Sequence, residues 1–360
     1  MKRGISRKAI VVGLSCLFVL CFASVLAAED PPQFSDWSAP VNLGAPVNSV
    51  GTEVDPFISK DGLSLYFACQ GCPGGYGSYD LYVSQRASVH DPWGPPQNLG
   101  PTVNTPYEES EPALSVDGHR LYFVSGRPGG FGGTDIYVAR RHNRRDDFGW
   151  QTPENLGGGV NSTSSDMQPF VIEDDASGII TLYFASDRPG GAGGNDIYAS
   201  TLQPDETFGP AVNVVELNSP ASEQGATVRQ DGLEIIFVSN RPGSILNRQG
   251  NPSYDLWVST RATTSDPWST PVNLDPLGLI GINTGRHDGG PSFSFHGTEL
   301  YFHAAQRAGN LGVGCPDAST CFFDIWMTTR AKLHGHDNDD DRYGDVRSRE
   351  DSGRDGHDRD

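Results

Sequence analysis

The sequence predicts an all-β chain folded as a five-bladed β-propeller with four strands in each blade. One pattern recurs five times: a Leu-Tyr-Phe strand, a Gly-rich loop, and a strand that opens with Asp. The opening Asp residues are spaced by 55, 61, 59 and 69 residues; they are Asp80, Asp135, Asp196, Asp255 and Asp324. The 44 Gly and 26 Pro residues also favour short strands joined by tight turns. A long period of strand units is typical of propellers, because one repeat cannot bury its own face.

The first 28 residues have the pattern of a signal peptide rather than of a folded domain. Lys2 and Arg3 begin a basic start, residues 9–26 form an apolar run, and Ala27 lies at a small-residue cleavage site. We therefore expect residues 1–28 to be removed and the protein to be exported, either to a periplasm or out of the cell. No second apolar stretch is long enough to span a bilayer, so we expect no membrane span after cleavage.

The charge of the chain excludes one large class of partner. The formal net charge is −19 at pH 7, whereas nucleic acid requires a basic footprint. We therefore exclude nucleic acid and expect attraction for cations and basic partners.

The second repeat shows the elements of one blade in order. Residues 112–115 form a first short strand, and 116–119 contain an Asp-Gly hairpin turn. Residues 121–125 form an apolar strand suited to burial on both faces. The Arg-Pro-Gly-Gly loop at 127–133 needs glycine for positive φ, and residues 135–139 form the third strand.

The fourth element of each repeat is displaced along the chain. Its pattern is Trp-x-x-Pro-x-Asn-Leu or a close variant, and its copies begin at Trp37, Trp93, Trp150, Phe208 and Trp268. One copy precedes the first triplet of strands and none follows the last. We therefore predict that residues 37–43 complete the blade built by residues 288–330, so that the ring has no long exposed edge strand. An open array of five units is the less favoured alternative.

Four cysteines lie outside the leader: Cys69, Cys72, Cys315 and Cys321. An even number in an exported protein favours disulfides over a zinc site. Ring closure makes the first and fifth blades neighbours, so two local pairs and two cross-links between these blades both remain open.

The repeat resembles the WD40-like PD40 family of TolB-like propeller repeats. The matching residues are Ser115, Asp117, Gly118, the Leu-Tyr-Phe run from Leu121, and the Asp-Ile-Tyr run from Asp135. The resemblance covers residues 34–330. It implies a propeller and leaves the function open, because propellers support many activities.

Every repeat has a carboxylate three residues before the residue at which its first strand is expected to open. These carboxylates are Glu53, Glu109, Asp166, Glu223 and Asp288. Asp55 and Glu111 add charge two residues further on in two repeats. Three interpretations are open. The carboxylates accept backbone N–H groups or pair with loop arginines such as Arg127, they converge on a Ca²⁺ ion, or they include the acid and base of a glycosidase.

Departures from the repeat point to a ligand-binding rim. Tyr76, Arg286 and His287 lie in loops that differ between repeats and could contact a sugar or peptide. Ordinary variation of surface loops is the alternative. The Asp residues that open the third strands are assigned to architecture, since Asp after a Gly-rich loop accepts amide hydrogens.

Residues 331–360 are nearly free of apolar side chains and are predicted to be a disordered charged tail. One stretch of the tail resembles the calcium loops of thrombospondin type 3 repeats, through Asp337, Asp339, Asp341 and Asp345. Arg342 occupies the position at which the turn normally has Gly. A solvated tail is therefore favoured over a calcium site.

These observations favour an exported, monomeric, non-enzymatic propeller that binds a protein or glycan at the cell envelope. The alternative is a five-bladed glycoside hydrolase or lyase that uses carboxylates at the channel mouth. A structural role in an envelope assembly is a third possibility. No cofactor is expected apart from the Ca²⁺ alternative. The chain contains no HExxH, GxSxG, P-loop or dinucleotide fingerprint.

Overall fold

A computed structural model describes residues 33–175, 177–305, 307 and 322–333. Within these residues the chain forms five antiparallel sheets of four strands and one two-stranded sheet. The predicted all-β, five-bladed propeller is confirmed. The leader, Cys315, Cys321 and the aspartates of the tail lie outside the described residues.

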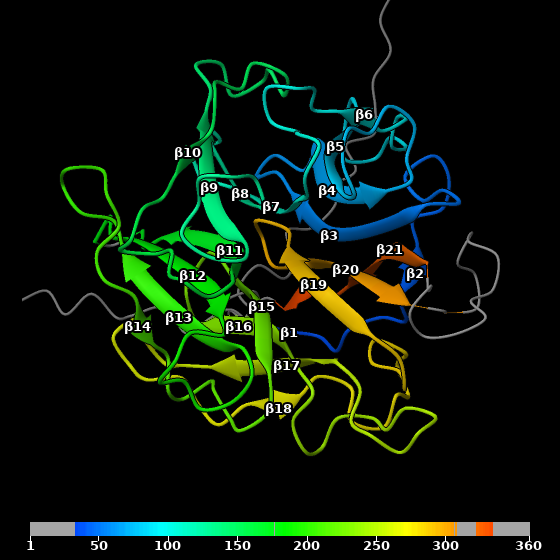
Figure 1. Ribbon diagram of the computed structural model, residues 1–360. Coiled ribbons are helices and arrows are strands. Elements are labelled where there is room, and N and C mark those ends of the chain that lie inside the picture. The colour runs from blue at the N-terminus through cyan, green and yellow to red at the C-terminus, as the bar shows by residue number, and fades with distance from the viewer. Residues whose placement is uncertain (1–32, 176, 306, 308–321, 334–360) are drawn as a thin grey trace, which may run out of the picture.

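The inner strand of every blade lines the centre of the molecule (Figure 1). These strands are β3 (Thr52–Ile58), β7 (Glu109–Leu114), β11 (Asp166–Glu173), β15 (Glu223–Val228) and β19 (Asp288–Phe293). The second strands are β4 (Ser64–Gln70), β8 (Arg120–Ser125), β12 (Ile180–Ser186), β16 (Glu234–Ser239) and β20 (Glu299–Ala305). Consecutive strands pair within each blade, so each Asp-Gly turn or its variant joins the first two strands.

The third and fourth strands form the outer half of each blade. The third strands are β5 (Asp80–Gln85), β9 (Asp135–Arg140), β13 (Asp196–Thr201), β17 (Asp255–Thr260) and β21 (Phe323–Thr329). The fourth strands have two residues each: β6 (Gln97–Asn98), β10 (Glu154–Asn155), β14 (Val212–Asn213), β18 (Val272–Asn273) and β2 (Val41–Asn42). They are shorter than the Trp-x-x-Pro-x-Asn-Leu pattern, which mostly forms the irregular approach to the strand.

The N-terminal part of the chain closes the ring, as predicted. Strand β2 pairs with β21, with Val41 opposite Met327, and completes the sheet of β19, β20 and β21. The described chain also continues past Arg330, the expected end of the propeller. There β22 (Lys332–Leu333) pairs with β1 (Gln33–Phe34). Both ends of the described chain are therefore held in β-structure.

An asparagine after each fourth strand fastens the adjacent third strand. At the closure, Asn48 Nδ2 donates to the Ile325 carbonyl at 2.9 Å, and the Ile325 amide donates to Asn48 Oδ1 at 2.8 Å. Equivalent clamps occur in the other blades through Asn104, Asn161, Asn218 and Asn283. Each clamp satisfies one backbone N–H group and adds a second hydrogen bond to a C=O group that already accepts the backbone amide of the residue after the fourth strand, as Ile325 does from Leu43.

The core consists of the second strands and their neighbours. Leu65, Tyr66 and Phe67 are all 0% exposed, which confirms the predicted burial on both faces of this strand. Full burial of such side chains stabilises by roughly 1.5–3 kcal/mol each. Within blade two, Arg141 Nη1 pairs with Asp147 Oδ1 at 2.6 Å, and Asp147 also accepts a hydrogen bond from the hydroxyl of Tyr66 in blade one. Adjacent blades are therefore joined by apolar packing and by hydrogen bonds to a buried ion pair.

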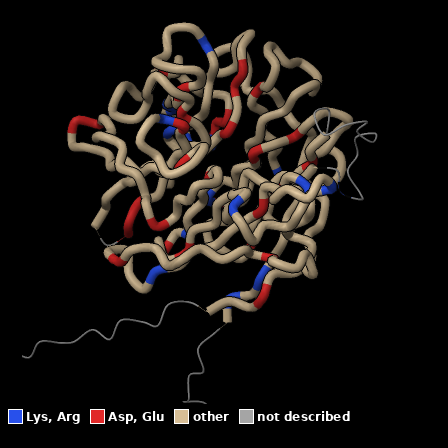
Figure 2. Tube along the Cα trace, turned by 60° about the horizontal axis from the view of Figure 1, so that its bottom comes forward, with Lys and Arg blue, Asp and Glu red and all other residues tan. Residues whose placement is uncertain are grey.

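Charged residues are distributed around the ring. Figure 2 shows Asp and Glu positions in all parts of the described chain, with Lys and Arg interspersed. No helix of the described residues is long and apolar enough to cross a membrane.

Candidate functional site at the central channel

The five carboxylates predicted as a ring lie near the start of the inner strands. Glu53, Glu109, Asp166, Glu223 and Asp288 are each 0% exposed. They occupy one register position, opposite Cys69, Ser125, Ser186, Ser239 and Ala304 of the second strands. The repeat therefore places them equivalently, but each lies inside its own blade.

Glu109 shows how these carboxylates are bound. Its Oε1 accepts hydrogen bonds from Thr105 Oγ1 at 2.6 Å and Ser125 Oγ at 2.7 Å, and it pairs with Arg127 Nη2 at 3.2 Å. Its Oε2 accepts the Thr105 amide. The guanidinium also lies over the rings of Phe123 and Tyr137. The side chain of Glu109 thus fixes the loop to the blade.

Three other blades repeat this arrangement with their own arginine. The pairs are Asp166 with Arg188, Glu223 with Arg241 and Asp288 with Arg307. Burial raises the pKa of Asp288 to about 6 even though Arg307 opposes the shift. These contacts agree with the first of the three interpretations, in which the carboxylates accept backbone N–H groups and pair with loop arginines. A role of the five carboxylates in ligand binding stays a prediction.

Blade one differs, because Glu53 has no arginine. Its Oε1 accepts a hydrogen bond from Ser49 Oγ and lies close to the Cys69–Cys72 disulfide. Burial raises the pKa of Glu53 to about 7. The cysteines thus form the local pair rather than a cross-link. In the described part of the chain, Glu53, Cys69 and Cys72 are the one group of three ligand-type side chains within 4.8 Å of one another, so the convergence that a central Ca²⁺ site needs is not found there.

The channel itself is lined by the residues two positions further along each inner strand. These are Asp55, Glu111, Gln168, Gly225 and Gly290, with φ of 52°, 57°, 52°, 60° and 57°. The register shifts at this point in each inner strand, as a β-bulge does. A non-glycine residue at positive φ is strained by about 1 kcal/mol or more, so the bulges hold Asp55, Glu111 and Gln168 at some cost.

Asp55 and Glu111 line a single cavity of about 40 Å³ together with Gln168, two phenylalanines and the prolines that follow the bulges. Glu111 Oε2 accepts a hydrogen bond from the backbone amide of Gln168 at 2.6 Å. Burial raises the pKa of Glu111 well above its usual range, and the negative charge of Asp55 raises it further. Burial therefore favours the neutral acid form of Glu111 beside a second carboxyl group.

His303 positions Asp55 from the neighbouring blade. The backbone amide of Asp55 donates to His303 Nδ1 at 3.0 Å, so this ring nitrogen is the acceptor. His303 Nδ1 lies 3.4 Å from Asp55 Oδ1. Gly290 allows this approach, since a Cβ there would lie 2.7 Å from His303 Nδ1 and 2.8 Å from Asp55 Oδ1.

An aromatic wall continues from His303. His287 stacks on Tyr254 with ring centroids 4.9 Å apart, and it contacts His303 at 5.5 Å and Phe323 at 5.3 Å. Burial, and then the proximity of His303, lower the pKa of His287 to about 3, so its ring is neutral. Tyr79 lies near Asp55. Its pKa is raised to about 12 by burial and by the charges of Asp55 and Glu108.

The predicted rim residues occupy different environments. His287 belongs to the aromatic wall, Arg286 is partly exposed beside it, and Tyr76 is 48% exposed on the Gly-rich loop of blade one. The Asp residues that open the third strands are architectural, as predicted: Asp80 Oδ2 accepts the amides of Tyr76 and Gly77.

The sequence pattern predicts the ring position as the candidate site and marks Asp55 and Glu111 only as additional charge. The reason is that the ring carboxylate occurs in all five repeats, whereas a carboxylate directly before proline occurs in two. The useful signal was therefore asymmetry between repeats. His303 gave no such signal, since its position in the repeat is that of the buried Val124.

No family model matches the chain. No curated protein matches it either. The assignment to the PD40 family therefore has no support from either comparison.

Solved structures share the fold at low identity. The catalytic domain of a GH62 α-L-arabinofuranosidase from Coprinopsis cinerea has a TM-score of 0.53 at 13% identity, covering 83% of this chain and 98% of that chain. An α-L-arabinofuranosidase from Lactobacillus brevis has a TM-score of 0.54 at 17% identity, covering 79% and 92%. An N-acetylgalactosamine deacetylase from F. plautii, in complex with blood group B trisaccharide, has a TM-score of 0.50 at 14% identity, covering 84% and 95%. At these low identities, the TM-scores show a common fold and nothing finer.

The comparison corrects the leading functional prediction. The structures named above are enzymes that act on glycans, and their fold is the fold of this chain. The prediction of a non-enzymatic binding propeller, with an enzyme as the less favoured choice, is contradicted by it. The glycoside hydrolase alternative is the one that the comparison favours.

Proposed function

We propose that the protein is a glycoside hydrolase whose catalytic pair is Glu111 and Asp55. The observation that carries the proposal is the contrast between these two carboxyl groups on neighbouring inner strands. Both line one cavity, and burial together with the charge of Asp55 raises the pKa of Glu111. Glycoside hydrolysis uses such a pair, with one carboxyl kept protonated and the other ionised.

Glu111 is assigned the role of general acid. Its carboxyl protonates the glycosidic oxygen as the bond to the leaving group breaks. Asp55 then acts on the anomeric carbon, either directly as a nucleophile or by activating a water molecule. The backbone bond from Asp55 to His303 and the bond from Gln168 to Glu111 hold the two groups in place.

In this proposal the sugar lies above the pair, on the loop side of the channel. The cavity of about 40 Å³ accommodates a few water molecules and is too small for a sugar ring. The scissile sugar therefore binds on the loop side. There the wall of Tyr254, His287 and Phe323 presents flat apolar faces of the kind that line small-molecule sites.

The first substrates to test are α-L-arabinofuranosides, because two of the structures with this fold are α-L-arabinofuranosidases by title. Hydrolysis of arabinofuranosyl-substituted polysaccharides and of aryl arabinofuranosides by the purified protein is the direct assay. On the polysaccharides, Asp55→Asn and Glu111→Gln are each expected to lower kcat/KM by about 10²–10⁴-fold. The control is Asp187→Asn, which removes an exposed carboxylate from a loop on the same side of blade three.

Activity that survives in both channel variants would place the chemistry elsewhere. Absence of turnover across arabinosides, xylosides and N-acetylgalactosaminides would remove the proposal.

Two further statements remain proposals of the same kind. Export to a periplasm or to the medium is supported by the Cys69–Cys72 disulfide, since disulfides persist in oxidising compartments. Membership of the PD40 family is supported only by the repeat pattern. Mass spectrometry of the mature N-terminus from an exporting host tests the first, with cleavage expected near residue 28.

A further inference from the structure

Blade one contains a disulfide at the place where other blades contain a serine and an arginine. Cys69 has the register position of Ser125, and Cys72 precedes Pro-Gly-Gly as Arg127 does. Gly71, with φ of 85°, turns the Cys69-Gln-Gly-Cys72 segment so that the two sulfurs meet. The substitution therefore affects both groups that bind the ring carboxylate in other blades.

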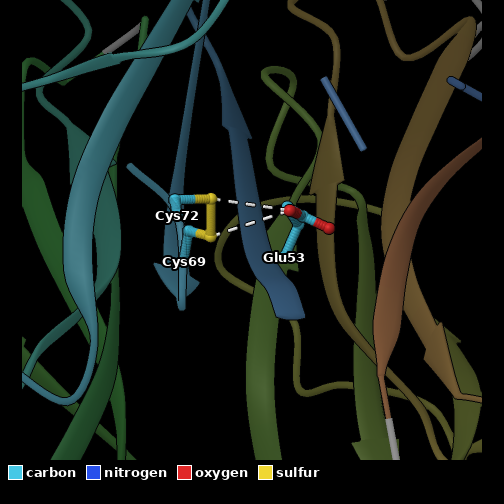
Figure 3. A group of neighbouring side chains, drawn as sticks. All are labelled: Glu53, Cys69 and Cys72. Carbon is cyan, nitrogen blue, oxygen red and sulfur yellow. Dashed lines mark hydrogen bonds between the residues drawn. A yellow bond between two sulfur atoms is a disulfide. The ribbon is translucent and has the colours of Figure 1, made fainter. Parts of the chain in front are cut away.

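Glu53 faces this disulfide directly. Figure 3 shows its carboxyl pointing at both sulfurs, with Oε1 3.6 Å from Cys69 Sγ and 3.5 Å from Cys72 Sγ. Ser49 Oγ lies 3.9 Å from Cys72 Sγ and donates to Glu53 Oε1. A disulfide sulfur has no hydrogen, so in the oxidised protein only the protonated form of Glu53 can donate a hydrogen bond in these contacts.

Among the described residues, Glu53 also has no cationic partner. The guanidinium that pairs with Glu109 in blade two has no counterpart among the contacts of Glu53, and the buried Glu53 Oε2 has no hydrogen-bond partner within the described structure. Burial raises the pKa of Glu53 to about 7. The charge of Asp324 raises this pKa as well, and a carboxyl in this state exchanges its proton near neutral pH.

The two sulfurs differ in exposure. Cys69 is 1% exposed, while Cys72 is partly exposed at the loop. An external thiolate can therefore reach Cys72 Sγ, and the buried Cys69 is the leaving group, adjacent to Glu53. Cys-x-x-Cys segments are the spacing in which thiols with lowered pKa and reversible disulfides occur.

We propose that Cys69–Cys72 is a redox-active disulfide that exchanges with low-molecular-weight thiols in the folded protein, with Glu53 as its proton donor and acceptor. This inference is independent of the proposed hydrolase activity.

The exchange proceeds in two displacements. A thiolate attacks Cys72 Sγ, a new S–S bond forms between the two, and the Cys69–Cys72 bond breaks. Cys69 leaves as a thiolate and takes the proton of Glu53, which is reprotonated from solvent. A second thiolate attacks the sulfur of the first thiol in the mixed disulfide and releases Cys72, which takes a proton from solvent. Two external thiols are thus oxidised to one disulfide, and the protein disulfide gains two electrons and two protons.

The experiment uses the full chain, oxidised and native, with reduced glutathione as the probe. Samples are quenched with iodoacetamide, and the tryptic peptide 61–86, which contains Cys69 and Cys72 but neither Cys315 nor Cys321, is quantified by mass spectrometry. Near-ultraviolet circular dichroism of the same samples reports whether the fold is intact. We expect both cysteines to become alkylated while the native spectrum is retained.

The role of Glu53 is tested by Glu53→Gln against the control Asp187→Asn. The measured quantity is the second-order rate constant for reduction, expressed per concentration of glutathione thiolate. It is expected to fall by at least about tenfold in E53Q below pH 7 and to stay unchanged in D187N. In the wild type the same constant is expected to fall as pH rises through about 7, as Glu53 loses its proton, and E53Q is expected to lack this step.

Two results would overturn the proposal. One is a disulfide that becomes alkylated only when the native spectrum is lost, which the wild type alone decides even if E53Q does not fold. The other is an E53Q variant that reacts at the wild-type rate with the wild-type pH profile.

Discussion

Glu109 and Arg127 form a buried ion pair, with Oε1 and Nη2 3.2 Å apart, whereas the equivalent Glu53 contacts a disulfide. Both carboxylates are fully buried at the same register position of neighbouring blades. The propeller therefore contains its own matched comparison of a buried carboxylate with and without a countercharge.

The first prediction concerns the stability of this pair of sites at pH 8. Glu109→Gln leaves Arg127 buried without its carboxylate, and we expect it to lower the free energy of unfolding by about 3 kcal/mol or more. Glu53→Gln replaces an unpaired buried charge by a neutral isostere and is expected to be neutral or stabilising. Urea unfolding followed by tryptophan fluorescence measures both. Equal losses in the two variants would contradict the structural difference.

The second prediction concerns pH. The pKa of Glu53 is about 7 in the folded protein against an ordinary value of 4.5. Between these values the folded state binds more protons than the unfolded state, so the contribution of Glu53 to stability decreases as pH rises from 4.5 to 7. The difference in unfolding free energy between wild type and E53Q is expected to change by about 1–3 kcal/mol across this window. A difference that does not vary with pH would show that Glu53 has an ordinary pKa.

The third prediction concerns closure of the ring. Asn48→Ala removes both hydrogen bonds to Ile325 and leaves its buried N–H group unpaired, at a cost of about 1–3 kcal/mol, while the Ile325 carbonyl keeps its bond from the Leu43 amide. Asn104→Ala does the same to Leu81 of blade one and is the matched control. Hydrogen exchange is expected to accelerate in β2 and β21 for N48A, and in β5 for N104A. Uniform acceleration in both variants would mean that the closing blade opens no more readily than the others.

The fourth prediction separates the roles of the channel carboxylates. If Glu111 supplies a proton to the leaving group, Glu111→Gln should lose much less activity on a 4-nitrophenyl glycoside than on a natural glycan, because nitrophenolate leaves without protonation. Asp55→Asn should lose activity on both by about 10²–10⁴-fold. Parallel kcat/KM measurements on the two substrates decide this. The same loss on both substrates for E111Q would remove its role as the acid.

The blades could be predicted from the sequence because their determinants are local. The Leu-Tyr-Phe run, the Asp-Gly turn and the Asp after the Gly-rich loop each act within a few residues, and five copies average out irregularities. Closure by β2 could also be predicted, since the blade built by residues 288–330 was the only one without a fourth strand for the displaced copy at Trp37 to complete. Predicting these features requires only that the same buried strand and the same turn residues recur in each repeat.

The candidate site could not be predicted in the same way. The ring of Glu53 and its equivalents is periodic, and in the four blades with an arginine the structure uses the carboxylate to hold its own loop. Asp55 and Glu111 face the channel because their residues adopt positive φ in a bulge, a conformation that the sequence pattern does not indicate for Asp or Glu. His303 reaches Asp55 from the opposite end of the chain.

The sequence by itself therefore determined the number of blades, their strands and the closure, because repeated local patterns dictate burial and turns. Only the tertiary structure decided which carboxylates meet in the channel and which face an arginine or a disulfide. Those relationships depend on distances between blades and on the loss of solvent around each group, and both arise only when the ring is closed.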